Sequence, residues 1–383
     1  MPAWMEKRQD LMKVALAEAA RGEGRTYPNP MVGAVIARGH RVIGMGHHRR
    51  WGLPHAEVEA LEDAAGPVRG ADLYVTLEPC CHWGKTPPCT DAIIGSGIRR
   101  VFVAIRDPNP VMRGKGIRHL RKAGLEVVVG LEAAAARKLN ESYIKFMTDG
   151  VPFVTLKLAQ SLDGKIATRK GESRWITGAG SRRHSRRLRA AAQAILVGAS
   201  TVANDDPGLL PSPRRSNYLR CVLDSGLRIS PDSGVVLTAS RYPTLVYHCR
   251  GSEERVRRLE ARGVTVVKVR AGRRGRGEGC GRGEGGGRGR SQARVDVRAV
   301  LADLAARGVM HLFVEGGGVV ASSFLRLGLV DKLVLFIAPR VMGDINGLGS
   351  FSEISIGSIK ESHGFRIDEV VPLGPDLIMT LYP

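Results

Sequence analysis

The spacing of hydrophobic residues along the first half of the chain predicts alternating helices and strands. Between residues 12 and 19, apolar side chains recur every third or fourth position, which predicts an opening helix. Helices are also expected near His55 and at Pro87, where proline suits a first turn. Short β-rich runs predict strands at residues 31–37, 41–45, 73–77, 101–105 and 126–129. This alternation predicts a layered α/β domain.

A turn at Asp149 and Gly150 precedes a second alternating stretch, so we place a domain boundary between residues 148 and 149. Strands are predicted at residues 153–158, 194–197, 220–224, 264–269, 311–315, 332–338 and 377–381, and helices at 252–262 and 297–307. The two predicted domains therefore span residues 1–148 and 149–383. Each is long enough to bury a core of its own.

Composition places the chain among globular proteins, since 43% of its 383 residues are hydrophobic and 25% are charged. No apolar run reaches the roughly eighteen residues of a membrane span, and residues 1–10 lack the hydrophobic segment of a secretion signal. We therefore expect a cytoplasmic protein with no membrane partner. Three of the six cysteines cluster at Cys80, Cys81 and Cys89, which in this compartment indicates metal binding or catalysis more than disulfides.

The net charge of +21 raises the question of a nucleic-acid partner. Much of the charge is local, because residues 182–189 hold five arginines and residues 272–290 hold six arginines and ten glycines. Phosphorylated small molecules also need cations, so we expect such a substrate and no nucleic acid. The 272–290 segment has no apolar periodicity and is predicted to be a disordered surface insertion. A nucleic-acid-binding tail is the alternative.

The strongest chemical signal joins His55 and Glu57 with Cys80 and Cys89. One imidazole and two thiolates are three protein ligands of a catalytic zinc, whose fourth position holds water. Glu57, two residues from His55, is the expected catalytic proton shuttle. A structural zinc would need a fourth protein ligand, for which Cys81 is the nearest candidate. Adjacent cysteines rarely both reach one ion, so we interpret Cys81 as a small filler.

The stretch from Pro79 to Cys89, PCCHWGKTPPC, resembles the riboflavin-pathway pyrimidine deaminases, as do residues 28–33 and 107–110. Eight residues separate Cys80 from Cys89, whereas other zinc deaminases have two between their cysteines. The resemblance covers nearly all of the first half and implies a cytidine-deaminase-like three-layer α/β/α fold. It further implies that the base, ribose and phosphate of the substrate contact Asn29, His48, His82 and Lys85.

The second half resembles the riboflavin-specific reductases, whose α/β fold is similar to that of dihydrofolate reductase. The resemblance lies in residues 154–177, 198–207 and 314–318 and covers most of residues 151–383. It implies that NADPH contacts Ala159, Trp175, Thr201, Asp205, Gly317, Gly318, Val319, Val320, Ala321, Ser322 and Ser323. It also implies that the sugar phosphate contacts Ser173, Arg189, Leu209 and Glu315.

Physical reasoning supports part of this assignment. Glycines 316–318 follow an apolar run and precede a helical one, and such a strand–loop–helix lets backbone approach a pyrophosphate. For these glycines, the alternative is a plain tight turn. For Arg189, the alternative is that it lies on a solvated basic face of a helix. The chain departs from the reductases where an arginine usually follows Asp-Asp-Pro. Here that arginine is displaced to Arg214 or Arg215, and the sequence does not distinguish the two.

Together these resemblances imply a bifunctional riboflavin-biosynthesis enzyme with the cofactors Zn²⁺ and NADPH. It would deaminate 2,5-diamino-6-ribosylamino-4(3H)-pyrimidinone 5′-phosphate and then reduce the ribosyl group to the ribityl side chain. We expect a homo-oligomer through the reductase domain. A polynucleotide or tRNA base deaminase with an appended domain is the alternative, disfavoured by the reductase motifs. A non-enzymatic binding protein is disfavoured by the intact Glu57 and its three neighbouring ligands.

Overall fold

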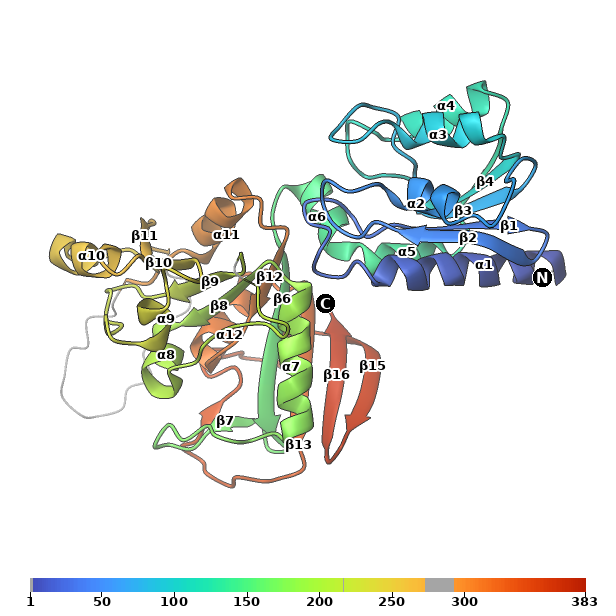
Figure 1. The fold of residues 1–383 in the computed structure, drawn as a ribbon. Coiled ribbons are helices and arrows are strands. Elements are labelled where there is room, and N and C mark those ends of the chain that lie inside the picture. The colour runs from blue at the N-terminus through green and yellow to red at the C-terminus, as the bar shows by residue number, and fades with distance from the viewer. Residues whose placement is uncertain (1–2, 216, 273–292) are drawn as a thin grey trace, which may run out of the picture. The chain divides into compact units, whose positions relative to one another are not determined.

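The chain divides into two compact units, Met1–Val151 and Pro152–Pro383. The computed structural model describes residues 3–215, 217–272 and 293–383 (Figure 1). The division lies three residues beyond the predicted boundary, because helix α6 (Glu141–Asp149) continues across that boundary. The predicted insertion at 272–290 lies outside the described residues, except for Gly272.

The described part of the first unit is built on a five-stranded mixed sheet with the order β2-β1-β3-β4-β5. Strand β1 is antiparallel to both of its neighbours, while β3, β4 and β5 are parallel. The bounds are β1 (Gly33–Arg38), β2 (Arg41–His47), β3 (Asp72–Leu77), β4 (Arg100–Ile105) and β5 (Glu126–Val129). Each overlaps one of the five predicted strands.

Helices cover both faces of this sheet, so the predicted three-layer α/β/α fold is confirmed (Figure 1). On one side lie α1 (Ala3–Ala20) and α5 (Ala133–Leu139), and on the other α2 (Ala56–Glu62), α3 (Cys89–Ser96) and α4 (Lys115–Lys122). Successive side chains of β3 point to alternate faces of the sheet and pack against the helices on both sides. Leu73 and Val75 pack with Ile93 of α3, while Tyr74 points to the opposite face and stacks on Phe102 at 4.6 Å between ring centroids.

Within the described residues, the second unit is built on a nine-stranded sheet with the order β11-β10-β9-β8-β12-β6-β13-β16-β15. The strands from β11 to β13 are parallel, and β16 and β15 continue the sheet in antiparallel pairing. The bounds are β6 (Phe153–Ser161), β8 (Ala194–Gly198), β9 (Leu219–Leu223), β10 (Thr244–His248), β11 (Thr265–Lys268), β12 (His311–Val314), β13 (Lys332–Ala338), β15 (Arg366–Leu373) and β16 (Asp376–Tyr382). Two short strands, β7 (Lys165–Ala167) and β14 (Leu348–Gly349), pair separately.

Two hydrophobic cores lie on opposite faces of this larger sheet. Along β8, Ala194 and Leu196 pack with α11 and α12, whereas Ile195 and Val197 pack with α8 and α9. The helices are α7 (Ala179–Ala191), α8 (Ala199–Asp205), α9 (Gly234–Leu237), α10 (Glu253–Glu260), α11 (Val297–Ala306) and α12 (Gly318–Arg326), with a 3-10 turn at Ile359–Glu361. A parallel sheet covered on both faces explains why its strands are continuous apolar runs.

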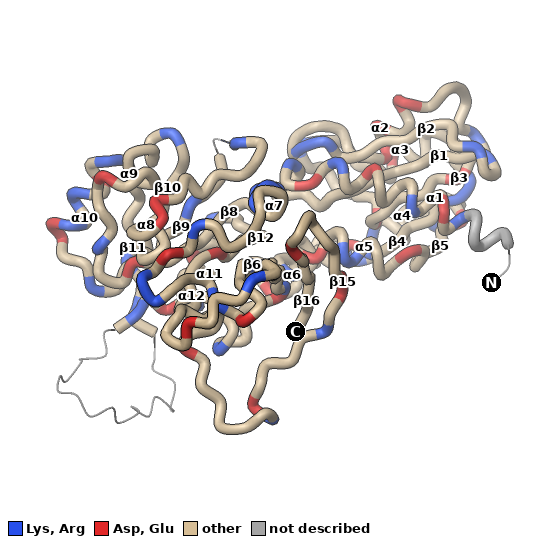
Figure 2. The backbone as a smooth tube through the Cα atoms, turned by 90° about the horizontal axis from the view of Figure 1, so that it is seen from below, with Lys and Arg blue, Asp and Glu red and all other residues tan. Residues whose placement is uncertain are grey.

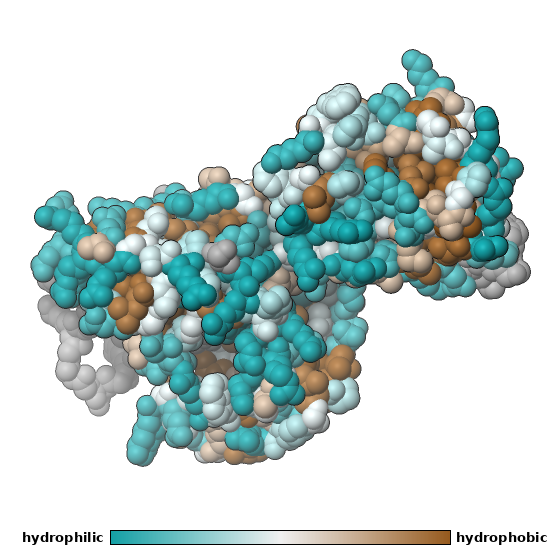
Figure 3. Space-filling model, viewed as in Figure 1, coloured by the Kyte–Doolittle hydropathy of each residue, from teal (hydrophilic) through white to brown (hydrophobic). Residues whose placement is uncertain are grey.

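The face of the molecule in Figure 3 is largely hydrophilic, with apolar side chains in separate small groups. None of the helices in the described part of the chain combines the length and apolar character that a membrane crossing requires.

Candidate functional site

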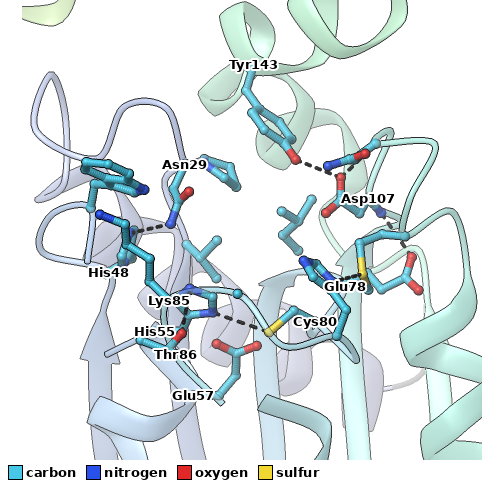
Figure 4. Close-up of a pocket in the computed structure, with 18 of the residues that line it drawn as sticks. Asn29, His48, His55, Glu57, Glu78, Cys80, Lys85, Thr86, Asp107 and Tyr143 are labelled. Atoms are coloured by element: carbon cyan, nitrogen blue, oxygen red, sulfur yellow. Dashed lines mark hydrogen bonds between the residues drawn. The ribbon is translucent and has the colours of Figure 1, made fainter. Parts of the chain in front are cut away.

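A cavity of about 270 Å³ lies in the first unit, at the sheet edge where β3 and β4 end. Its walls come from the segment before β1, the loops after β2, β3 and β4, and the first turn of α2 (Figure 4). Parallel strands commonly present their ligand site at their carboxyl ends. The lining includes the four predicted substrate contacts and three of the predicted zinc-site residues: Asn29, His48, His82, Lys85, His55, Glu57 and Cys80.

The three predicted metal ligands converge from separate elements. His55 is the N-cap of α2, Cys89 is the first residue of α3, and Cys80 lies in the loop after β3. The Nδ1 atom of His55 lies 3.5 Å from the Cys80 Sγ and 3.2 Å from the Cys89 Sγ. Tetrahedral zinc holds sulfur at ~2.3 Å and nitrogen at ~2.0 Å, which separates such donors by roughly 3.5 Å. The three side chains therefore fit a zinc ion.

The charge of this cluster also suits a cation. Hydrogen bonds from the Cys89 side chain and from His55 lower the pKa of the Cys80 thiol to about 4. The Cys89 backbone N–H also donates to the Cys80 sulfur, at 3.3 Å. In the described chain, the only group of His, Cys, Asp and Glu side chains arranged to hold a metal comprises these three residues. Cys81 is not a member, so the protein leaves a fourth position open, as a catalytic zinc requires.

Glu57 lies in the first turn of α2 and is only 3% exposed. Burial raises the pKa of its carboxyl group to about 7, and the nearby Cys80 thiolate adds to the shift. Figure 4 shows this carboxyl group pointing toward the space beside His55 and Cys80. A carboxyl group with a pKa near neutrality can both take up and release a proton at physiological pH.

His48 and Asn29 form a hydrogen-bonded pair on another wall of the cavity. The Nδ1–H of His48 donates to the carbonyl oxygen of Pro54 at 3.1 Å, so its Nε2 accepts from the Asn29 amide nitrogen, also at 3.1 Å. Burial lowers the pKa of His48, which favours the neutral ring that this arrangement needs. The amide oxygen of Asn29 then points into the cavity, where it can accept a hydrogen bond from a pyrimidine.

Lys85 and His82 lie on the loop between the two cysteine ligands. The Lys85 ammonium lies 3.4 Å from the centroid of the Trp51 ring, a cation–π contact that orders a flexible side chain at the cavity wall. The Nδ1 atom of His82 is 3.1 Å from the sulfur of Met112. An ordered ammonium at this position suits a phosphate group.

Sequence reasoning gave no role to the residues that shape the far wall of the cavity. Buried Glu78 accepts backbone N–H groups from Asp107, Gly114 and Ile117 at 3.1, 2.9 and 3.2 Å, which fixes the loop after β4. The Tyr143 hydroxyl donates to Asp107 at 3.0 Å, and burial raises the pKa of Asp107. The motif at residues 107–110 was a signal for this wall, but the contacts that give it a role span 29 to 39 positions.

A second polar cluster lies in the second unit around Glu315, which directly follows the last residue of β12. Arg189 of α7 donates to both carboxylate oxygens of Glu315, at 3.0 and 2.7 Å, and the Ser185 hydroxyl donates at 3.1 Å. Burial opposes ionisation, but Arg189 and Lys157 together lower the pKa of Glu315 to about 2. Lys157 of β6 was not predicted from the sequence. Burial lowers its pKa, and Glu315 is the nearby charge that favours its protonation.

Two of the glycines after Glu315 lie where the surrounding atoms leave no room for a Cβ atom. Gly316 has a φ of +122°, and a Cβ there would meet the Thr201 hydroxyl oxygen at 2.8 Å. A Cβ on Gly318 would lie 2.4 Å from the Gly349 carbonyl oxygen. Gly317 is the N-cap of the nine-residue helix α12, whose free backbone N–H groups suit a pyrophosphate. Three predicted cofactor contacts, Thr201, Gly317 and Gly318, therefore lie at or beside this glycine loop.

The other predicted cofactor contacts differ in accessibility. Trp175 is 60% exposed, and Ala159 is half-buried in β6. Val319 and Ser323 lie on the more accessible side of α12. By contrast, three residues of α12 are buried and can reach a ligand only through their backbone: Val320, Ala321 and Ser322.

The predicted sugar-phosphate contacts are also divided. The Ser173 hydroxyl donates to the predicted cofactor residue Asp205 at 2.9 Å. Leu209 is 2% exposed, and its side chain packs in the core shared with β8, so a ligand could contact only its backbone. Arg215 donates to the carbonyl oxygen of Ala192 at 2.6 Å, whereas Arg214 is exposed.

Two family models match the chain. The "RibD C-terminal domain" model matches residues 152–379, and the "Cytidine and deoxycytidylate deaminase zinc-binding region" model matches residues 5–105. The second match contains His55, Cys80 and Cys89.

Whole-length relatives and solved structures agree with these matches. The chain is 43% identical to riboflavin biosynthesis protein RibD of Aquifex aeolicus, with 97% of each chain covered. It is 40% identical to RibD of Bacillus amyloliquefaciens over 97% of this chain and 95% of that one. A structure of Acinetobacter baumannii RibD superposes with a TM-score of 0.83 at 32% identity, covering 99% of both chains. The Thermotoga maritima diaminohydroxyphosphoribosylaminopyrimidine deaminase/5-amino-6-(5-phosphoribosylamino)uracil reductase superposes with a TM-score of 0.82 at 34% identity and the same coverage.

Proposed function

Because this chain belongs to the RibD family of riboflavin-biosynthesis proteins, we propose that its two polar sites, one in each unit, carry out its two reactions. The chain is a bifunctional deaminase and reductase that uses Zn²⁺ and NADPH. It deaminates 2,5-diamino-6-ribosylamino-4(3H)-pyrimidinone 5′-phosphate and then reduces the ribosyl group to ribityl. The observation that carries the assignment of the first site is the convergence of His55, Cys80 and Cys89 beside the buried Glu57.

In the deaminase site, a zinc ion held by His55, Cys80 and Cys89 supplies Lewis-acid activation of a water molecule. Glu57 would take one proton from the attacking water and pass it to the ring nitrogen, and would then take the remaining hydroxyl proton and pass it to the amine, which departs as ammonia. A pKa near 7 lets the same carboxyl group act in both directions. The pairing of Asn29 with a neutral His48 orients the amide oxygen toward the pyrimidine edge.

The phosphate end of the deaminase substrate is held by Lys85 and His82. Both lie on the loop that joins the two thiol ligands, so substrate binding and metal binding share one segment. The stack of Lys85 on Trp51 fixes the ammonium before the substrate arrives, which reduces the entropy lost on binding.

In the reductase site, bound NADPH would supply the hydride for the reduction of the ribosyl group to ribityl. The N-terminus of α12 binds the cofactor pyrophosphate, with Thr201, Asp205 and Trp175 as further contacts. Arg189, Glu315 and Lys157 form a charged cluster in the buried part of the site. The fixed charges of this cluster orient the sugar. Ser173 and the backbone of Leu209 complete the sugar-phosphate contacts.

The alternative of a polynucleotide deaminase has less support. Figure 2 shows Lys and Arg positions scattered along the backbone of each unit, with acidic positions between them. The second half of the chain matches the RibD C-terminal domain over residues 152–379.

Product analysis tests the proposed function. The purified full-length protein is incubated with the diaminopyrimidine phosphate, with and without NADPH, and the products are followed by mass spectrometry. We expect the deaminated ribosyl compound without NADPH and the deaminated ribityl compound with it. No mass change under either condition would contradict the proposal.

We also propose that residues 1–148 and 149–383 act as the deaminase and reductase domains of a cytoplasmic enzyme. Reducing conditions in the cytoplasm keep the Cys80 and Cys89 thiols free to bind metal.

Finally, we propose that the enzyme is a homo-oligomer through its reductase domain. Strand β15 ends the larger sheet, and the hairpin that it forms with β16 exposes apolar side chains, namely Ile367 (55%), Val370 (49%), Val371 (39%) and Leu377 (43%). A second copy of the hairpin can continue the sheet and cover this surface. Light scattering after size-exclusion chromatography should give a dimer or larger, and a smaller mass for Val370→Lys. A wild-type monomer would contradict the proposal.

A further inference from the structure

We propose that Asn140, at the junction of α5 and α6, is a positioning residue of the deaminase. Its side chain holds the segment that carries Asn29 in the geometry that receives the pyrimidine. The inference rests on the proposed function, since it concerns how that same site binds its substrate. It begins from the short segment before β1, on which Asn29 lies at the wall of the cavity.

The segment around Asn29 has few backbone groups of its own with which to anchor itself. Prolines stand on both sides, at positions 28 and 30, and a proline has no backbone N–H to donate. The N–H of Asn29 donates to the carbonyl oxygen of Thr26 at 2.9 Å, within the same stretch of chain. Strand β1 begins only at Gly33. The position of Asn29 therefore depends on contacts from elsewhere in the unit.

Asn140 supplies such a contact on one side of Asn29. Its carboxamide oxygen accepts from the backbone N–H of Met31, and its amide nitrogen donates to the carbonyl oxygen of the same residue, both at 2.8 Å. The Asn140 side chain is buried, at 1% exposure, so these two hydrogen bonds form away from water, where they are stronger. Met31 lies two positions after Asn29 and 109 positions before Asn140. The pair therefore joins two distant parts of the unit beside the cavity.

A second contact from the same place holds the other side of Asn29. The hydroxyl of Ser142, in the first turn of α6, lies 3.2 Å from the hydroxyl of Tyr27. Tyr27 precedes Asn29 by two positions, just as Met31 follows it by two. Both flanks of Asn29 are thus held by side chains from one helix start.

Tyr143 extends this region of contact to the far wall of the cavity. Its hydroxyl donates to Asp107 at 3.0 Å, and Figure 4 shows its ring between Asp107 and Asn29. Asn140, Tyr143 and Asp107 all lie beyond residue 105, where the match to the zinc-binding region ends. The zinc ligands lie within that matched region, whereas the walls around the substrate depend on residues outside it. A change at Asn140 should therefore disturb substrate binding and leave the metal in place.

The usual role of asparagine at the start of a helix does not account for Asn140. It is the N-cap of α6, where such a side chain commonly accepts from a backbone N–H of its own helix. Among the described residues, its side chain accepts no such hydrogen bond from α6. Both of its polar groups bind Met31 instead, which requires a donor and an acceptor in one side chain. Asparagine and glutamine have both, whereas an aspartate carboxylate only accepts.

The test measures deamination of the diaminopyrimidine phosphate by the full-length protein. For Asn140→Ala we expect the KM to rise at least about tenfold, with zinc content near one per chain and reduction of the deaminated substrate unchanged. Asn140→Asp should be impaired as much, and Asn140→Gln should recover part of the loss. Asp72→Asn is the control, because Asp72 is also buried but pairs with Arg100 at the other end of β3, at 2.6 Å. It should keep the wild-type KM even where it lowers stability.

A double-mutant cycle shows whether Asn140 acts through Asn29. Asn29→Ala removes the amide that faces the pyrimidine, so adding Asn140→Ala to it should raise the KM little further. Effects of the two substitutions that simply multiply would show that Asn140 acts on the site by another route, and would overturn the inference.

The inference is also overturned if Asn140→Ala keeps the wild-type KM, if it loses zinc in proportion to activity, or if Asp72→Asn raises the KM equally. Where Asn140→Ala does not fold, Ser142→Ala removes only the contact with Tyr27 and should raise the KM by a smaller factor. A wild-type KM in Ser142→Ala and in Asn140→Asp would then overturn the inference. A wild-type protein that does not deaminate would instead contradict the proposed function, and that failure is visible before any variant is made.

Discussion

The most direct prediction at the scale of single residues concerns Glu57. Replacing its carboxyl group by an amide in Glu57→Gln keeps the shape of the side chain but removes the proton shuttle. We expect deamination to fall by about two to four orders of magnitude, while the zinc content stays near one per chain. Ammonia release and elemental analysis measure the two quantities.

Glu59→Gln is the matched control for that variant. Glu59 lies two residues further along α2 and pairs with Arg49 at 2.6 Å, outside the group of metal ligands. It should deaminate like wild type. Near-normal turnover in Glu57→Gln would show that Glu57 is not the proton shuttle, and loss of zinc from that variant would show that it supports the metal instead.

A second residue-scale prediction concerns Thr86. His55 directs Nδ1 to the two thiols, while its Nε2 lies 3.5 Å from the Thr86 hydroxyl. A group bonded to the far nitrogen of a metal-binding histidine fixes the orientation of the ring and supports metal affinity. Thr86→Val should weaken zinc binding about tenfold or more in competition with a chelator, and Thr86→Ser should keep it. Equal zinc affinity for all three proteins would show that Thr86 is only part of the loop.

These residues also show what a sequence can reveal about a site. His55, Glu57, Cys80 and Cys89 were predictable because their chemistry is specific and their spacing is short. Glu78 was not, because its importance lies in three backbone N–H groups that approach it from 29 to 39 positions away. A carboxylate that serves only the backbone leaves no pattern in the sequence.

At the scale of elements, most strands of the larger sheet were predicted, but the interior strand β10 and the edge strand β15 were not. Buried strands such as β8 and β12 read as short apolar runs, which is why residues 194–197 and 311–315 were identified. Strand β15 was not predicted, because it carries arginine, aspartate, glutamate and proline and is exposed along most of its length. Its pairing with β16 depends on an edge position, which local sequence does not specify.

One element-scale prediction concerns His311, which joins three elements. This first residue of β12 lies opposite Phe153 of β6, accepts from or donates to the Thr155 hydroxyl at 2.9 Å, and approaches the carbonyl oxygen of Ala191, the last residue of α7, at 3.3 Å. Burial lowers its pKa to about 4, and the nearby Lys332 adds to the shift.

The sign of the resulting pH dependence follows from the unfolded chain, in which histidine titrates near 6.5. Between pH ~6.5 and ~4 the unfolded state binds a proton that the folded state does not. Stability from His311 is therefore complete above pH ~6.5 and is lost as the pH falls toward 4. Between pH ~7.5 and ~5, the free energy of unfolding should fall by up to about 2 kcal/mol more in wild type than in His311→Asn. Urea titrations at the two pH values measure this difference, and equal pH dependence would contradict it.

At the scale of the whole molecule, the large positive charge has an explanation in small-molecule chemistry. Both reactions act on phosphorylated compounds, and the reductase also binds a phosphorylated cofactor. Cations are expected at sites for phosphorylated ligands, and Lys85 lines the first site while Lys157 lies beside Glu315 in the second, which is one reason why net charge alone would have misdirected the prediction toward nucleic acid.

The division into two units with separate cores leads to a final prediction, that the two reactions are separable. Glu57→Gln should reduce the already deaminated substrate at the wild-type rate, because its substitution lies in the core and cavity of the first unit alone. Glu315→Gln should deaminate normally and fail to reduce, since it removes the carboxylate that Arg189 and Lys157 hold ionised. Normal deamination by Glu315→Gln shows that the first unit has folded, and binding of NADPH at the wild-type affinity would show the same for the second unit.

A mixture of the two variants tests this separation most strictly. Each variant lacks one reaction, so neither alone should convert the diaminopyrimidine substrate to the reduced product. In the mixture, the intermediate released by Glu315→Gln reaches the intact reductase site of Glu57→Gln through solution. Mass spectrometry should then detect the ribityl product after a lag that shortens as protein concentration rises. If the mixture stays inactive although Glu57→Gln reduces added deaminated substrate, Glu315→Gln does not release its intermediate into solution, and the two reactions would not be separable.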